Sequence, residues 1–422
     1  RRALAIKSDY AEAHFNLGIA LKAQGNLNEA VASYRRALAL NANYIEAHNN
    51  LGNALRELGL VEDSLASYRL ALALKPDYIE AHNSLIYALR ALGRLDEAVE
   101  CAGRALALKP DFAETHHNLG NVYCDLGDMD QAMIRFQKVR ELDPSDLGWH
   151  AANWLAVLHY LEGDVEQCRA MLMATQQARE VHIEEYMHAR NYRNYVALLV
   201  PYLEQHRGSN AGLEELPCLH VIGESHSLAA HGAVVDYRER TMRCKAEWIL
   251  GCKQWHLGND QANRFKRRFE TIMADLPGHS TILLTIGEID CRPDEGIIAV
   301  CKKRPESSLE EVARTTARGY VAYVSRINAQ YGHRMIICGV PATNHPLESL
   351  EVDTAGQLIH VIRLMNATLK VEALLAGMDF LDVHALTDQG DGIASGDLHI
   401  DTIHLLPRAI VEAFARHCIK AG

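Results

Sequence analysis

Three short segments in the second half of the chain carry residue types that can perform acyl transfer. Gly223-Glu224-Ser225 ends one apolar run, Gly287-Glu288-Ile289-Asp290 ends another, and Asp401-Thr402-Ile403-His404 lies near the C-terminus. Glycine before the serine permits a sharp turn from strand to helix, which would expose the hydroxyl. The aspartate and histidine of the last segment are three residues apart, so the carboxylate can reach the ring. A nucleophilic serine requires such a base, oriented by such an acid.

These segments resemble the sequence blocks of the SGNH, or GDSL, hydrolase family, which contain GDS, GxND and DxxH in this order. The resemblance implies that Ser225 is the nucleophile, His404 the general base and Asp401 the residue that orients it. It also implies a glycine that binds the oxyanion, which would be Gly258 beside Asn259 in HLGND. The pattern is closer to a divergent branch associated with surface-glycan modification than to ordinary lipases.

The middle segment departs from the family pattern. Ile289 stands where the family has an oxyanion-binding asparagine, and loss of such a donor costs on the order of 100- to 1000-fold in rate. Arg292 could bind a carboxylate or phosphate, or supply the missing positive charge, and Glu288 is expected beside it in the pocket. For Asp290 we expect a buried ion pair. Asn344, which follows another strand end, is a further pocket residue and a candidate for the missing amide.

Residues 238–268 form a basic stretch in an acidic chain, with nine Lys or Arg against three acidic residues. The stretch also contains Trp248 and Trp255. Aromatic rings beside cations suit sugars or anionic glycans through stacking and charge. The alternative interpretation is a solvated basic face of a helix.

Four β-rich runs position the candidate residues, at 218–223, 280–287, 334–340 and 378–383. Helical stretches separate them, including one that begins at a capping pair formed by Ser308 and Glu311. Alternating strands and helices predict a parallel sheet with helices on both faces and chemistry at the carboxyl ends of the strands. We therefore expect residues 217–422 to form an α/β flavodoxin-like three-layer SGNH-type domain with a mainly parallel sheet.

The first half of the chain repeats with a period of 34 residues, starting at Ala11, Ile45, Ile79 and Ala113. Apolar residues follow helical spacing, and a glycine separates the two helices of each unit. The pattern resembles the tetratricopeptide repeat (TPR) family, which implies an α-solenoid, or TPR superhelix, over residues 1–176. We expect a partial repeat at 1–10 and a fifth, degenerate unit near 147. Its Gly163 falls two residues late, which predicts a lengthened turn.

Two polar positions recur in register along the repeats. The first row consists of His14, His48, His82, His116 and His150. Stacked helices lie about 8–10 Å apart, so these histidines cannot share one metal ion, and we expect them to have a packing role between helices. Asn16, Asn50 and Asn118, with Ser84 in the third repeat, form a second row. The array is similar to that of the O-linked N-acetylglucosamine transferases, in which such a ladder holds an extended peptide. The alternative is a solvated polar row.

Residues 177–216 are expected to form one or two helices that cap the solenoid, since every array needs a polar cap. Tyr192, Tyr195 and Tyr202 are expected to pack on the following domain. RGSNAG, at 207–212, is the candidate linker.

Composition excludes several classes of protein. The net charge of −11 argues against a dedicated nucleic-acid binder, and no apolar run is long enough to span a membrane. Ten scattered cysteines without a CxxC pair favour reduced thiols and a cytoplasmic location. Arg1 lies inside a repeat, so we expect the natural array to be longer.

These features together predict a serine-dependent acyl-transfer enzyme with a TPR module that binds a protein or peptide partner. The enzyme would be an esterase or deacetylase, or an O-acyltransferase, acting on a small ester or an acylated glycan without a cofactor or metal ion. The alternative is a non-catalytic TPR interaction protein whose SGNH-like domain is a degenerate ligand-binding module. A glycosyltransferase is disfavoured, because the second domain is too short for paired nucleotide-sugar domains.

Overall fold

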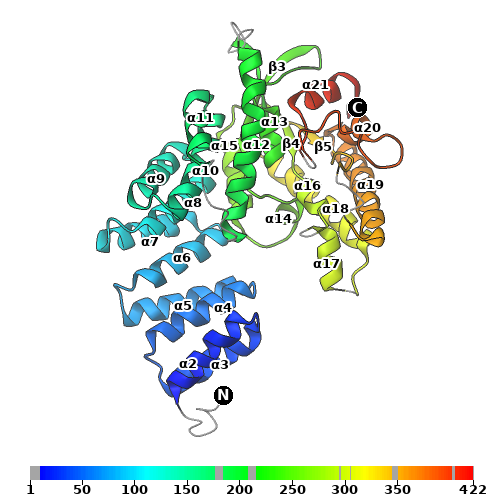
Figure 1. The fold of residues 1–422 in the computed structure, drawn as a ribbon. Coiled ribbons are helices and arrows are strands. Elements are labelled where there is room, and N and C mark those ends of the chain that lie inside the picture. Colours follow the sequence, from blue (N-terminus) through cyan, green and yellow to red (C-terminus); the bar gives the residue numbers. More distant parts are fainter. Residues whose placement is uncertain are drawn as a thin grey trace. The chain divides into compact units, whose positions relative to one another are not determined.

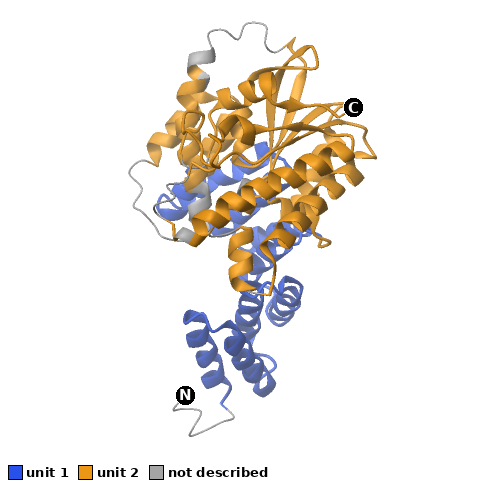
Figure 2. Ribbon diagram, turned by 90° about the vertical axis from the view of Figure 1, so that its right-hand side faces the viewer, with its two compact units in different colours: residues 1–152, 262–264 blue, residues 153–261, 265–422 orange. Residues whose placement is uncertain are grey.

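The computed structural model describes residues 10–175, 184–207, 215–293, 296–304, 306–344, 350–401 and 404–421. The chain divides into two compact units, coloured separately in Figure 2. Unit 1 comprises residues 1–152 with 262–264, and unit 2 comprises residues 153–261 with 265–422. The boundary at Ala152 therefore lies inside the fifth repeat. The expected partial repeat at 1–10 and the linker at 207–212 fall almost wholly outside the described residues.

Unit 1 consists of helices that follow the repeat register of the sequence (Figure 1). The first helix of each pair begins at the residue where the sequence repeat begins, and a glycine with φ between 74° and 85° separates it from the second helix. Glycine adopts this left-handed conformation without a steric penalty. The helices are α2 (Ala11–Ala23), α3 (Leu27–Leu40), α4 (Ile45–Glu57), α5 (Val61–Leu74), α6 (Ile79–Ala91), α7 (Leu95–Leu108), α8 (Ala113–Leu126), α9 (Met129–Leu142) and the start of α10 (Asp146–Leu161).

Each helix pair is held together by one small and one large residue. A Cβ atom added to Gly52 in α4 would lie 2.5 Å from the Tyr68 ring of α5, and the first and fourth repeats contain the same glycine–aromatic contact. In the third repeat the sizes are exchanged, since Ile86 and Ala102 occupy the equivalent positions and both are fully buried. The total volume is preserved, which is the condition for close packing.

Three of the recurring histidines link the first helix of their repeat to the loop before it. The Nε2 atoms of His48, His82 and His116 lie 2.8–2.9 Å from backbone carbonyl oxygens six residues earlier. The bonded carbonyl in the third repeat, for example, is that of Pro76. These contacts fit the expected packing role of the row.

The fifth repeat differs from its prediction. Its turn is not lengthened, because the Gly163 amide bonds to the Tyr160 carbonyl and the Asp164 amide to that of His159. The fourth repeat has the same pattern at Gly127 and Asp128. The extra residues are taken up by α10, which has 16 residues where α8 has 14.

Unit 2 contains one sheet of seven strands in the order β2-β3-β1-β4-β5-β6-β7. The sheet is mixed: the inner strands β3, β1, β4, β5 and β6 pair in parallel, whereas β2 and β7 pair antiparallel at the edges. The strands are β1 (Cys218–Gly223), β2 (Val234–Tyr237), β3 (Arg240–Trp248), β4 (Thr281–Thr285), β5 (Arg334–Cys338), β6 (Asp379–Leu381) and β7 (Cys418–Ile419). The four runs expected from the sequence are β1, β4, β5 and β6.

Helices precede these strands or connect them, and helices pack on both faces of the sheet. They are the remainder of α10, α11 (Val165–Ala174), α12 (Glu184–Arg207), α13 (Ser225–Ala230), α14 (Gln254–Gly258), α15 (Arg264–Asp275), α16 (Glu288–Cys291), α17 (Ile297–Lys303), α18 (Leu309–Asn328), α19 (Val352–Leu375), α20 (Val383–Thr387) and α21 (Pro407–Arg416). In the part of the chain that the structure describes, no helix is long and apolar enough to cross a membrane.

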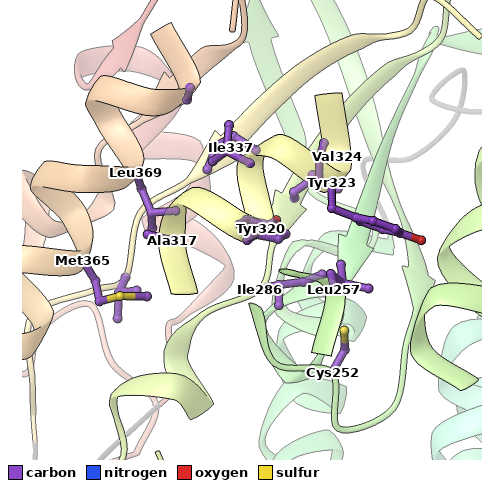
Figure 3. Close-up of a cluster of buried hydrophobic side chains, with 14 of the residues drawn as sticks. Cys252, Leu257, Ile286, Ala317, Tyr320, Tyr323, Val324, Ile337, Met365 and Leu369 are labelled. Atoms are coloured by element: carbon purple, nitrogen blue, oxygen red, sulfur yellow. The ribbon is translucent and has the colours of Figure 1, made fainter. Parts of the chain in front are cut away.

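Alternate residues of the central strands enter two separate cores. Leu284 of β4 packs in the larger core with residues of α15, α18 and α19, part of which surrounds Tyr320 in Figure 3. Leu283, the preceding residue, packs in the other core with Ile410 and Phe414 of α21. This alternation follows from the two-residue period of a strand.

The structure corrects one interpretation of the basic stretch at residues 238–268. The first part of this stretch is β3, an inner strand of the sheet, and not a face of a helix. Met242, Cys244 and Trp248 are buried, and charged residues alternate with them, which is the period of a strand with one solvated face. Because Trp248 pairs with Gly223, the end of β3 lies directly beside the end of β1.

We expect the Gly52→Ala variant to lose about 1–3 kcal/mol of unfolding free energy, because the added methyl group enters the Tyr68 ring. The matched control is Gly103→Ala in α7, where nothing lies within 4 Å of the added Cβ. That substitution should instead stabilise unit 1 by about 0.5–1 kcal/mol through helix propensity. Urea denaturation of both variants measures the difference, and equal stabilities would contradict the packing argument.

Candidate active site

Ser225 follows the end of β1, at the first residue of α13. Gly223 before it is required by close approach to β4, because an added Cβ would lie 2.1 Å from Thr285 Oγ1. The serine side chain is only 2% exposed. Its hydroxyl donates a hydrogen bond to the Glu224 carboxylate, and its amide donates to the same oxygen at 2.6 Å. Ser225 is therefore held by its own neighbour in the sequence.

Glu224 is a buried carboxylate with several partners. Its second oxygen accepts a hydrogen bond from the Tyr192 hydroxyl of α12. Burial alone would raise the pKa of Glu224, but the charge of Arg292 and the hydrogen bonds from Ser225 and Tyr192 outweigh it, so the pKa is lowered. Glu224 is thus ionised at neutral pH. Arg292, expected as a pocket cation, acts electrostatically on this carboxylate.

Asp401 and His404 form the pair expected from their spacing. The Asp401 carboxylate lies 2.7 Å from His404 Nδ1 and also accepts the His404 amide at 2.6 Å. Asn344 donates its side-chain amide to the Asp401 carbonyl at 2.9 Å. Asn344 therefore holds the loop that carries the pair, and this contact differs from the oxyanion role considered for it.

The bridging helix α12 holds the histidine from the other side. The Tyr195 ring stacks on the His404 ring with centroids 4.0 Å apart and planes inclined by 22°. The Tyr195 hydroxyl also donates to the Leu405 carbonyl at 3.2 Å. The orientation of His404 is consequently set by Asp401 at one edge and by Tyr195 on one face.

His226 brings the serine segment and the histidine segment together. Its ring centroid lies 5.7 Å from that of His404, and it directly follows Ser225 in the chain. Burial, reinforced by the nearby His404, lowers the pKa of His226 to about 3, so this ring is neutral at neutral pH. The Ser225 hydroxyl donates to Glu224 and not to His404, so the three residues implied by the family resemblance do not form a hydrogen-bonded chain.

The structure places Gly258 and Asn259 in contacts outside this cluster. Gly258 packs against α18, where an added Cβ would lie 2.7 Å from the Tyr320 amide nitrogen. The Asn259 side chain donates to the Trp255 carbonyl at 2.9 Å. A different glycine, Gly251, follows the end of β3 and donates its amide to the Tyr192 hydroxyl at 3.3 Å. The alternation of apolar and charged residues at 240–248 indicates a strand that ends just before Gly251, and this is the sequence signal that could have identified Gly251.

Asp290, in the segment after β4, caps α14. Its carboxylate accepts the backbone amides of Gln254 and Trp255, at 2.7 and 3.3 Å, at the start of that helix. The ion pair expected for Asp290 stays a prediction. The side chains of Glu288 and Ile289 lie outside the described part of the chain.

An aromatic cluster surrounds Tyr192. The Trp248 ring lies 5.1 Å from Tyr192 in an edge-on arrangement, and Trp154 lies 5.9 Å from Tyr192 and 5.7 Å from Trp248. Trp248 is only 3% exposed, so it packs in the interior and is not available to stack on a sugar. The cluster fixes the hydroxyl that binds Glu224.

In unit 1 the polar row keeps its register. Asn16, Asn50, Ser84 and Asn118 are each the sixth residue of α2, α4, α6 and α8, respectively. Asn16 is exposed and the other three are partly exposed. They are therefore accessible at equivalent positions, as binding of an extended chain would require. Across the described ranges, no group of His, Cys, Asp and Glu side chains is arranged to hold a metal ion.

Comparison with protein families identifies TPR repeats in the N-terminal part of the chain. A TPR repeat model matches residues 18–59 and 87–127. Three further tetratricopeptide repeat models match residues 45–78, 113–146 and 149–172. The last match includes the degenerate fifth unit. A search of curated proteins found no match.

Several solved structures are similar to the chain. A structure of pilF from Pseudomonas aeruginosa is 22% identical, with a TM-score of 0.40, over 48% of this chain and 87% of that one. TTC0263, a thermophilic TPR protein of Thermus thermophilus, is 24% identical, with a TM-score of 0.38, over 45% of this chain and 100% of that one. YrrB, described as a TPR protein with an unusual peptide-binding site, is 22% identical, with a TM-score of 0.35, over 45% of this chain and 96% of that one.

We expect Tyr192→Phe to cost about 1.5–3 kcal/mol of stability, because a buried carboxylate loses a hydrogen-bond donor. Tyr160→Phe is the matched control, since that hydroxyl donates to the neutral Leu228 carbonyl and should cost only about 0.5–1.5 kcal/mol. Denaturant unfolding measures both values.

The excess cost of Tyr192→Phe should depend on pH. Glu224 has a lowered pKa in the folded protein, so its contribution is present above the unfolded value of about 4.3 and is lost as pH falls through the folded value. The excess should therefore be largest at neutral pH and shrink in acid. A pH-independent excess would mean that the charge of Glu224 is not involved.

Proposed function

We propose that residues 217–422 form an SGNH-like domain that performs serine-dependent acyl transfer. The candidate residues follow β1, β3 and β4 or lie in the loop before α21, and the inner strands are parallel, which suits chemistry at their carboxyl ends. The order of these inner strands, β3-β1-β4-β5-β6, also supports a flavodoxin-like assignment. The substrate class is a small ester or an acylated glycan.

The main support is the Asp401–His404 pair, at 2.7 Å, beside the segment that carries Ser225. Because Asp401 holds Nδ1, the Nε2 atom of His404 is left to accept a proton. Such a histidine, fixed on one edge by a carboxylate, is the base that a serine nucleophile needs. Hydrogen bonds between nucleophile and base are often absent before substrate binds.

In the proposed reaction the Ser225 hydroxyl first turns from Glu224 toward His404. The oxygen attacks the ester carbonyl carbon as its proton passes to His404 Nε2, and the carbonyl oxygen becomes an anion. The amides of Ser225 and Gly251, which follow the ends of β1 and β3, are candidate donors to that anion once they turn from Glu224 and from the Tyr192 hydroxyl. His404 then protonates the departing alkoxide and is neutral again. In the second step it takes the proton of water or of a sugar hydroxyl as that oxygen attacks the acyl carbon, and it returns a proton to the Ser225 oxygen as the ester bond to Ser225 breaks.

The alternative is a non-catalytic ligand-binding domain. It is favoured by the partners of Ser225, because Glu224 holds both its hydroxyl and its amide. Ile289 at the position of the family asparagine points the same way. In that case the domain would bind a ligand without turning it over.

For the TPR repeats we propose binding of a protein or extended peptide. The row of Asn16, Asn50 and Asn118 supports this, because each amide offers a donor and an acceptor to a peptide backbone. They occupy the same position of the first, second and fourth repeats, with Ser84 in the third, which matches a ligand that runs along the array.

A fluorophosphonate probe tests the catalytic proposal. We expect the wild-type protein to be labelled at Ser225 and to hydrolyse at least one ester from a panel of acetyl esters. Ser225→Ala should abolish labelling and lower hydrolysis by on the order of 1000-fold or more. Ser227→Ala is the matched control, since it removes a buried hydroxyl that bonds only to the Glu224 carbonyl. A wild type that neither labels nor hydrolyses any ester would support the non-catalytic alternative.

A peptide array tests the proposal for the repeats. Peptides bound by the wild type should lose at least about tenfold in affinity for a variant with Asn16, Asn50 and Asn118 all changed to alanine, because each hydrogen bond contributes about 0.5–1.5 kcal/mol. Asn28→Ala, at an exposed position of α3, is the control and should bind normally. If the triple variant binds peptides with unchanged affinity, the row of asparagines is excluded as the peptide-binding site.

A further inference from the structure

Unit 2 contains a pocket of about 370 Å³ between α14, α17 and α18. Trp255 of α14, Ile297 and Val300 of α17, and Val312 of α18 contribute apolar surface to it. The Ser225, Glu224 and His404 side chains do not line this pocket. It is therefore a concave site separate from the Ser225 cluster, with a lining of its own.

The pocket exposes apolar groups that the core would normally bury. Trp255 is 51% exposed, although the other tryptophans of the fold are less accessible, and Val300 is 40% exposed. Both side chains face the same cavity. An accessible indole ring beside an aliphatic wall offers a flat surface to the ring of a ligand.

Three cationic side chains line the same cavity. Lys253 precedes α14, Lys303 ends α17, and Arg304 follows it. Lys303 and Arg304 are exposed, and no ion pair joins either of them to an acidic group within the described ranges. The one acidic residue of the lining, Asp290, directs its carboxylate to the backbone amides of Gln254 and Trp255. The cavity is consequently positive in a chain whose net charge is −11.

The helix that carries the stacking surface is held at two points. The Asp290 carboxylate caps α14 through the amides of its first two residues. His256, next to Trp255, stacks on the Phe265 ring with centroids 4.0 Å apart and planes inclined by 13°. Such preorganisation lowers the entropy that a ligand must lose on binding.

We propose that this pocket binds a sugar ring that carries an anionic group. The sugar ring would stack on Trp255 and lie against Val300, and its carboxylate or phosphate would be held by Lys303 and Arg304. A neutral sugar would lose the ionic contacts, and an inorganic anion would lose the stacking. Binding at this pocket does not depend on the proposed acyl transfer at Ser225.

Fluorine NMR of the full chain labelled with 5-fluorotryptophan tests the proposal. The chain has four tryptophans, and the resonance of Trp255 is identified by its loss in Trp255→Phe. We expect glucuronic acid, glucose 6-phosphate or both to shift this resonance saturably, with glucose and inorganic phosphate at least about tenfold weaker. If only glucuronic acid shifts the resonance, the ligand class is a uronate. If only glucose 6-phosphate shifts it, the ligand class is a sugar phosphate.

Paired variants separate the two contacts. Trp255→Ala, followed by calorimetry, should weaken binding at least about tenfold, and Lys303→Ala with Arg304→Ala should do the same and remove the preference over glucose. The double change Arg35→Ala and Arg36→Ala removes two exposed cations from α3 and should bind like the wild type. Ser225→Ala should also bind normally, which distinguishes this site from the catalytic proposal.

Two outcomes overturn the inference. One is the absence of a saturable Trp255 shift with either anionic sugar, while the other three tryptophan resonances show that the protein is folded. The other is a shift of equal strength with inorganic phosphate alone, which would reduce the pocket to a simple anion site.

Discussion

The buried carboxylate of Glu224 is the interaction on which the candidate site depends. A lone charge in the interior would be strongly unfavourable, so its neighbours must compensate it. Ser225 and Tyr192 donate hydrogen bonds to it, and Arg292 supplies opposite charge. These partners come from three separate parts of the chain: the end of β1, helix α12 and the segment after β4. One carboxylate therefore organises elements that the sequence places far apart.

Because of this constraint, α12 is part of the candidate site. A helix expected to cap the solenoid and to pack its tyrosines on the following domain contributes Tyr192 to Glu224 and Tyr195 to the face of His404. The aromatic cluster with Trp154 and Trp248 holds Tyr192 in place. The candidate site thus includes a helix that precedes the predicted domain limit at residue 217. Any catalytic chemistry at Ser225 would depend on that helix.

Local patterns predicted the repeats well, and the site only in part. Helix starts at Ala11, Ile45, Ile79 and Ala113 follow from periodicity, since each repeat packs on its neighbour by the same contacts. The Asp401–His404 pair was predictable because its residues share one turn. Gly258 is indicated by a short motif alone, whereas the contact of Gly251 with Tyr192 follows from the position of the strand at residues 240–248.

The sequence by itself determined the features that depend on neighbours along the chain: the helix pairs, the four recognised strands and the serine at the end of β1. Tertiary structure decided which distant groups meet. Whether the Ser225 hydroxyl faces Glu224 or His404, and which tyrosine covers the histidine, depends on the packing of elements from different parts of unit 2. Burial, charge and volume are summed over all neighbours in space, and no spacing within one segment contains that sum.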